Sequence, residues 1–290
     1  MQLVFTAALG RTGTHNLAQL FQRYGVDCVA EHEPPQLLLQ QLGHRPFFAR
    51  RGWLEERSRL ARLGRGLQRR FVVTEELLGR GRALDWYDAG DDERIRALAR
   101  RRLRRVERFR RAGAKHYVET GQFFLRTFCY ALHELVPEMG VIKLTRDPLE
   151  AARSLANRGK HPFNNSLPPD RPSNLFRIAD WSRLTPFQLY VHLWLETELR
   201  WLAFRERAAV SRVFEISTPE LSQPERVAAL FRRFGIEHRP FGTLAPSNAN
   251  REPTRVSTED VRQFHAVLDL LPAAQRERIA WLRDYRPEAA

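Results

Sequence analysis

A short loop near the amino terminus combines glycines, hydroxyl groups and a cation, which together suit the binding of an anion. We call it the glycine loop; its residues are Gly10, Arg11, Thr12, Gly13, Thr14 and His15. Residues 3–8 before it predict a strand, and residues 13–24 predict a helix. In such a turn, backbone N–H groups and the helix N-terminus face one concavity. The loop is therefore a candidate anion site, in which the threonine hydroxyls donate hydrogen bonds and Arg11 supplies a permanent cation.

Two observations limit this interpretation of the glycine loop. It does not match the G-x-x-x-x-G-K-[ST] pattern of ATP- and GTP-binding loops, because no lysine follows its second glycine. Taken alone, it also fits an ordinary turn between a strand and a helix. His15 falls in the first turn of the predicted helix, where contact with a ligand and packing against neighbouring elements are both open.

A second polar group follows another predicted strand, residues 140–145. Arg146 comes directly after this strand, and Ser154 lies eight residues further along the chain. Pro148 favours a helix start there, because its fixed φ and missing N–H cost nothing in a first turn. The helix would bring both side chains to the same end of the sheet, where an arginine and a hydroxyl suit a phosphate monoester. A local ion pair at the start of the helix is the alternative for Arg146.

Together, these two groups resemble the nucleotide-binding motifs of sulfotransferases, which use 3′-phosphoadenosine 5′-phosphosulfate (PAPS). The glycine loop is similar to the family's 5′-phosphosulfate loop, and Arg146 with Ser154 resembles its 3′-phosphate motif. Glu33 and the proline after it are similar to a Glu-Pro pair in carbohydrate and bacterial glycolipid sulfotransferases, where the glutamate is the proposed base. The resemblance covers residues 2–30, 115–157 and 187–216.

The resemblance implies PAPS as the donor, 3′-phosphoadenosine 5′-phosphate (PAP) as the product, and no metal. A sulfonate would pass to a hydroxyl or amine by in-line displacement, with Glu33 as the base and Arg11 neutralising charge on the bridging oxygen. This branch of the family implies a carbohydrate or glycolipid acceptor. The chain departs from the cytosolic branch, which has lysine in place of Arg11 and usually threonine or serine in place of His15. The histidine base of that branch has no clear counterpart here.

Two residues near Glu33 are further candidates for binding the acceptor. His32 adjoins Glu33, but alternation along a strand would send it to the opposite face, so a packed or surface histidine is the alternative. Glu119 ends another predicted strand, residues 116–119. It is a candidate for binding the acceptor or orienting Arg11, and capping of the following helix is its alternative.

A polar loop late in the chain supplies two more candidates. In sulfotransferases a late basic loop often closes over the 3′-phosphate, which makes Arg251 and Arg255 candidates for that contact. A solvated linker before the last helices is the alternative for this loop.

Alternating strand-like and helix-like stretches predict an α/β fold, with a P-loop-type parallel sheet flanked by helices. We expect one domain over residues 1–290, with a mainly helical insertion at 34–114 and a helical C-terminal part at 217–290. Further strands are expected at 26–30 and 213–216, and a long helix at 187–208. Residues 94–111 predict an amphipathic helix with ten arginines against one glutamate. It is either a solvated face or a surface for an anionic polymer or headgroup.

The net charge of +14 indicates attraction to anionic ligands. The arginines that supply most of this charge are spread along the whole chain, so no specific nucleic-acid partner is expected. No apolar run is long enough to span a bilayer, although peripheral membrane contact stays open. Cys28 and Cys129 lack metal-binding spacing and favour buried thiols in the cytoplasm. Two other functions stay open: a small-molecule or nucleotide kinase with a degenerate loop, and a non-catalytic polyanion-binding protein.

Overall fold

The computed structural model describes residues 1–33, 76, 79, 81–157, 168–242, 255–282 and 285. Its centre is a five-stranded sheet in the order β2-β3-β1-β4-β5, in which every neighbouring pair is parallel. The predicted α/β fold is thereby confirmed. The strands are β1 Gln2–Ala8, β2 Cys28–His32, β3 His116–Thr120, β4 Gly140–Thr145 and β5 Arg212–Ser217.

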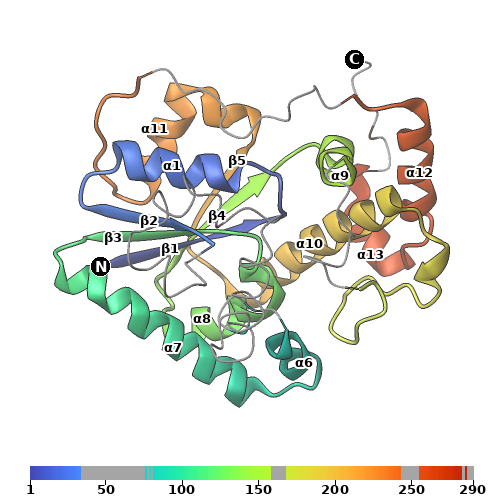
Figure 1. The fold of residues 1–290 in the computed structure, drawn as a ribbon, viewed down its shortest axis with the longest axis horizontal. Coiled ribbons are helices and arrows are strands. Elements are labelled where there is room, and N and C mark those ends of the chain that lie inside the picture. The colour runs from blue at the N-terminus through green and yellow to red at the C-terminus, as the bar shows by residue number, and fades with distance from the viewer. Residues whose placement is uncertain are drawn as a thin grey trace, which may run out of the picture.

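Helices cover both faces of the sheet (Figure 1). One face carries α1 (Thr14–Tyr24) and α11 (Pro224–Arg233), and the other carries α7 (Asp92–Arg111) and α8 (Cys129–Leu135). Side chains of β1 alternate between these two layers, as the pleat of a strand requires. Those packed with α7 and α8 are Leu3, Phe5 and Ala7. Those packed with α1 and α11 are Val4 and Ala8.

A third group of helices lies beyond the carboxyl ends of the strands, on the right of Figure 1. It packs around a second core that includes Leu149, Trp194, Leu195 and Phe264. The long helix α10 belongs to both parts, because its Phe204 lies in the core beneath the sheet. The helices of this third group are α9 Pro148–Ala156, α10 Pro186–Ala208, α12 Thr258–Leu268 and α13 Ala273–Arg278.

The remaining elements are short. They are α6 Arg82–Asp88, the π-helical turn η1 Phe124–Phe128, and the 3₁₀ turns η3 Trp181–Arg183, η4 Pro219–Ser222 and η5 Ala280–Leu282. Within the described residues, no helix combines the length and apolar character needed to cross a membrane. Most of the insertion predicted at 34–114 and the loop that contains Arg251 lie outside these residues.

The second strand begins later than predicted, at Cys28 instead of residue 26. The Val26 amide donates to the carbonyl of Glu237 at 2.8 Å, so it is not available to the sheet. Asp27 then adopts a left-handed backbone with φ 51°, which breaks the extended conformation. The shift carries His32 into the strand and leaves Glu33 just past its end.

Candidate functional site

The glycine loop lies at the point where the chain changes direction across the sheet. From β1 the chain passes through α1 to β2 at one edge, whereas from β4 it passes through α9 and α10 to β5 at the other. In open parallel sheets the crevice outside the carboxyl ends of two such strands is the usual ligand site. The glycine loop follows β1 and Arg146 follows β4, so both open onto this crevice.

The glycine loop has a backbone that few residues tolerate. Arg11 and Gly13 both have left-handed φ values, 69° and 89°. For a non-glycine residue such as Arg11 this conformation costs about 1 kcal/mol or more. A Cβ on Gly13 would also lie 3.0 Å from the Leu221 side chain. Such local strain is typical of ligand-binding turns, where the surrounding structure holds the backbone in place.

Thr12 differs from expectation. The Thr12 hydroxyl donates to the carbonyl of Leu9 at 2.6 Å, so it closes the loop instead of pointing a donor at a ligand. The Thr12 carbonyl in turn accepts from the Thr218 hydroxyl at 2.8 Å. Thr14 is the first residue of α1 and its side chain is buried. The backbone amides of the loop are therefore better placed as anion donors than the Thr12 hydroxyl.

The two polar groups that follow β1 and β4 contact each other directly. Arg11 donates through Nε to the Ser154 hydroxyl at 3.3 Å. Arg146 donates through Nη1 to the carbonyl oxygen of Arg11 at 3.2 Å. Ser154 is completely buried on α9, so its hydroxyl is fixed in place. Arg11 thus forms one cationic corner with Arg146 and Ser154, which lie more than a hundred residues further along the chain.

The backbone around this corner is held from three sides. The indole of Trp194 donates to the Arg146 carbonyl at 3.2 Å. Asp147 caps α9 by accepting from the Glu150 amide at 2.9 Å, and it also accepts from the Tyr285 hydroxyl. Burial, and then the Asp147 hydrogen bond, raise the pKa of Tyr285, so the phenol stays a donor. Arg146 itself pairs with Glu150, one helical turn further along the chain, at 3.0 Å.

Glu33 lies across the crevice and is held by a residue that sequence reasoning missed. The Gln122 amide donates to Glu33 Oε1 at 3.4 Å, and its oxygen accepts from Arg126 at 3.2 Å. The same oxygen lies 2.7 Å from where a Cβ on Gly10 would sit, so a larger residue at that position would displace the Gln122 side chain. Gln122 therefore contacts both the glycine loop and Glu33. Its place two residues after β3, next to β1, was the signal available in the sequence.

The two histidines come together on the α1 side of the sheet. The rings of His15 and His32 have centroids 5.2 Å apart and lie nearly perpendicular, at 77°. His15 contacts Gln19 at 3.1 Å and His32 contacts the Thr120 hydroxyl at 3.2 Å. Both rings are thus packed among neighbours at the carboxyl edge of the sheet.

Glu119 does not belong to this group, which corrects both roles expected for it. Its side chain is 5% exposed and faces α7, where Arg102 binds it through two nitrogens. Side chains alternate along β3, so Glu119 points to the face opposite Thr120 and His32. The bonds that the structure describes for it go to Arg102 and Tyr117, and no side chain caps the turn η1 that follows β3. Arg255 is exposed before α12, and no described bond joins it to the glycine loop. Arg251 lies outside the described residues.

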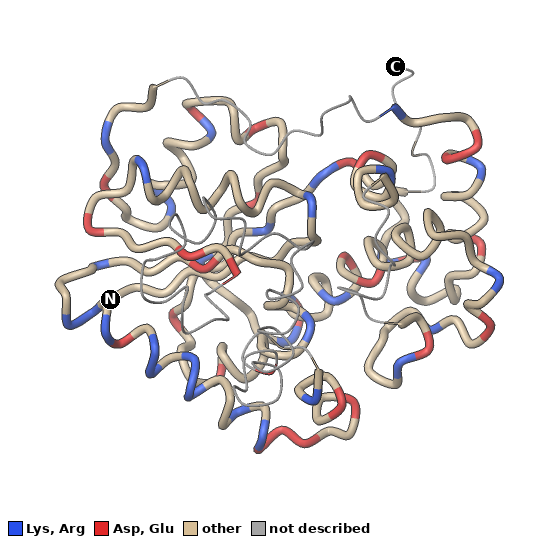
Figure 2. The backbone as a smooth tube through the Cα atoms, viewed as in Figure 1, with Lys and Arg blue, Asp and Glu red and all other residues tan. Residues whose placement is uncertain are grey.

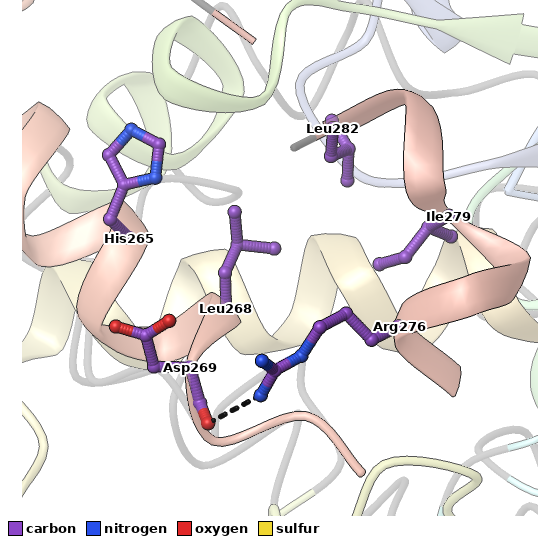
Figure 3. A pocket seen from close by; sticks show the side chains of 6 residues that line it. All are labelled: His265, Leu268, Asp269, Arg276, Ile279 and Leu282. Carbon is purple, nitrogen blue, oxygen red and sulfur yellow. Dashed lines mark hydrogen bonds between the residues drawn. The ribbon is translucent and has the colours of Figure 1, made fainter. Parts of the chain in front are cut away.

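A separate cavity of about 210 Å³ lies between α12 and α13 and shares no residue with this site (Figure 3). Arg276 donates across it to the carbonyl of Asp269 at 2.9 Å and to that of Leu271 at 3.1 Å. The arginine therefore holds the turn between the two helices. The other lining residues are His265, Leu268, Ile279 and Leu282.

The fold and the site together define an α/β protein with a glycine loop at the switch point of a parallel sheet. A cationic corner flanks the loop on one side and a carboxylate held by an amide flanks it on the other. No model of a known protein family matches the chain, and no curated protein shows significant similarity to it.

Proposed function

We propose that the chain is a sulfotransferase that moves a sulfonate from PAPS to a hydroxyl or amine of a carbohydrate-containing acceptor. The observation that carries the proposal is the contact of Arg11 with Ser154 and Arg146. Such a corner suits an anionic ligand, because the guanidinium of Arg11 lies beside the Ser154 hydroxyl and that of Arg146 lies against the glycine loop. The sequence motifs for the 5′ and 3′ ends of PAPS meet at this corner.

In this proposal each residue has one task at the moment of transfer. Arg146 and Ser154 bind the 3′-phosphate, and Ser154 then exchanges its contact with Arg11 for one with the ligand. The loop amides and Arg11 bind the sulfonate and the 5′-phosphate. As the acceptor oxygen bonds to sulfur, the bond from sulfur to the 5′-phosphate oxygen breaks, and Arg11 stabilises the negative charge that develops there. PAP leaves with that charge.

Glu33 takes the proton that the acceptor loses in this reaction. A positioned carboxylate base typically contributes about 10² to 10⁴-fold to the rate. The Gln122 amide fixes one carboxylate oxygen of Glu33, which leaves the other for the acceptor. Positioning and charge stabilisation then supply most of the rate enhancement, as in phosphoryl transfer.

Ligand-induced thermal stabilisation tests the proposed nucleotide site. PAP should raise the melting temperature, because at a hundredfold excess over Kd a ligand adds about 2.7 kcal/mol of stability. The nucleotide 5′-AMP lacks the 3′-phosphate and should give little shift. Equal shifts with the two nucleotides would remove the 3′-phosphate assignment, and a shift only with ATP and Mg²⁺ would favour a kinase.

A further inference from the structure

The outer face of α7 carries a row of arginines, which we call the α7 arginine stripe. Figure 2 shows basic residues along the whole length of this helix. Spacings of three, four and seven residues place the members on one helix face. They are Arg94, Arg101, Arg104, Arg108 and Arg111, all of them exposed.

The stripe is separate from the arginines that hold α7 against the sheet. Arg102 is buried on Glu119, and Arg105 pairs with Glu31 at 2.7 Å. Of the stripe, Arg108 also reaches Glu31, at 3.7 Å. The apolar side of α7 packs into the core through Ile95, Leu98 and Val106. Because this inward side fixes the helix, the stripe is a rigid surface feature. Changing its residues does not disturb the core.

The middle of the stripe has no acidic partner in the part of the chain that the structure describes. Arg94 pairs with Asp91 at one end, and Arg111 is 3.9 Å from Glu107 at the other. Arg101 and Arg104 between them, and the neighbouring Arg100, make no described hydrogen bond or ion pair. These guanidinium groups stay open to an external anion.

We propose that the α7 arginine stripe binds a linear anionic polysaccharide bearing sulfate or carboxylate groups. The stripe is about 26 Å long. Its members from Arg101 to Arg111 are separated by about 5 Å along the helix, and Arg94 lies about 10 Å before Arg101, so the stripe suits a chain with repeated charges. Guanidinium groups bind such oxyanions with two parallel hydrogen bonds. This inference goes beyond the proposed sulfonate transfer and does not depend on it.

Two other anionic partners fit the stripe less well. Single-stranded nucleic acid binds where bases stack on exposed rings, but Phe109, the only aromatic residue of α7, stacks on Tyr117 at 5.8 Å between centroids. Stable attachment to a membrane surface usually needs apolar side chains or a lipid anchor besides the charges. The large apolar residues of α7 face the core, so the helix offers charge alone.

Fluorescence anisotropy with end-labelled heparin oligosaccharides tests the proposal. A hexadecasaccharide should bind more tightly than a hexasaccharide, and added salt should weaken both. The variant R101E/R104E should bind the longer probe at least about tenfold more weakly. The matched control R232E/R239E makes the same change of charge on the opposite side of the sheet, at exposed residues, and should bind nearly as the parent does.

Equal losses in the two variants would overturn the proposal, because binding would then follow net charge and not the stripe. Tighter binding to phosphatidylglycerol vesicles, single-stranded DNA or duplex DNA, measured at the same salt concentration, would overturn it in favour of that partner. Thermal stabilisation by PAP, measured on the same variants, should be unchanged. Loss of the stripe and failure of the proposed nucleotide site are thus observed separately.

Discussion

Gln122 links the two halves of the candidate site through one side chain. Its amide holds Glu33, its oxygen accepts from Arg126, and it closes against Gly10. The guanidinium of Arg126 sits over the ring of Phe123 and is itself buried, so this chain of contacts has little freedom. We therefore assign Gln122 a positioning role, through Glu33, in the proposed reaction.

Replacing Gln122 with leucine should slow turnover without weakening nucleotide binding. Loss of the amide leaves Glu33 free to rotate, so kcat for sulfonate transfer should fall about tenfold, which corresponds to ~1.4 kcal/mol. The pH profile of kcat should also shift, since a donor to the carboxylate has gone. PAP affinity should hold, because Gln122 does not contact Arg146 or Ser154.

Two further variants serve as controls for the effect of Gln122→Leu on turnover. Glu33→Gln removes the carboxylate and should abolish transfer while it keeps PAP binding. Gln223→Leu changes an exposed glutamine at the start of α11 and should behave as the parent. An unchanged kcat and pH profile in Gln122→Leu would rule out the positioning role.

The sequence named Arg11, Arg146 and Ser154 as candidate site residues, but it predicted neither their contacts with one another nor their other partners. Arg11, Arg146 and Ser154 each carry a local signal, because each stands in a motif directly after a strand or within the helix that follows. Gln122 and Thr218 carry only their position after a strand, which is a weak signal because a glutamine or threonine there is common. The prediction for Glu119 was wrong because a residue at a strand end is expected to face the crevice. Its side chain instead lies on the face of β3 that packs against α7.

At the scale of elements, α7 and β3 are joined by charges that the sheet forces together. Glu31 on β2 and Glu119 on β3 are register partners, so two carboxylates lie side by side. Arg102 and Arg105 of α7 neutralise them, and Tyr117 donates to Glu31 at 2.7 Å. This explains why the inner side of an amphipathic helix keeps two arginines. Periodicity alone predicts the helix but cannot identify the strand residues that those arginines meet.

Removing only the Glu119 carboxylate should lower the unfolding free energy more than replacing both Glu119 and Arg102. Glu119→Leu leaves Arg102 buried without a counter-charge, which typically costs about 3–5 kcal/mol of unfolding free energy. The double variant Glu119→Leu with Arg102→Met should recover most of that loss, because two apolar side chains can fill the same space. Urea unfolding of both variants and of the parent measures the difference.

A carboxylate on the outer side of α7 provides the control for these measurements of unfolding free energy. Glu107→Gln on the outer side of α7 should change stability by less than about 0.5 kcal/mol. A double variant as unstable as Glu119→Leu alone would contradict the proposed charge compensation.

Over the whole molecule, the sheet and the helices that cover its two faces could be predicted more fully than the third group of helices beyond the strand ends. Alternating strand-like and helix-like stretches and the helical periodicity of residues 94–111 predict a parallel sheet flanked by helices, and the structure confirms it. The way α9, α10 and α12 pack beside the sheet depends on contacts with no local signature. One example is Arg153 of α9, which pairs with Asp260 of α12. Another is Glu196, whose carboxylate accepts from the amides of Leu175 and Phe176.

His192 connects this packing to the stability of the whole chain in acid. It lies on α10, fully buried, with Nε2 2.7 Å from the carbonyl of Phe176 and Nδ1 without a partner among the described residues. Burial lowers the pKa of His192, and the nearby charges of Glu196 and Arg200 act in opposite directions. The folded protein thus keeps the ring neutral at pH values where the unfolded chain would protonate it.

The unfolding free energy should therefore fall as the pH drops below the ordinary histidine pKa of about 6.5. In that range the unfolded chain binds one proton more at this residue, so acid favours unfolding by up to about 1.4 kcal/mol per pH unit. His192→Gln keeps a donor for the Phe176 carbonyl and removes the titration, so its stability should decline less between pH 7 and pH 5. His265→Gln on α12 should follow the parent curve. The unfolding free energy of each variant is measured by urea unfolding at each pH. If it falls equally steeply with pH in His192→Gln and in the parent, protonation of His192 does not cause the loss of stability in acid.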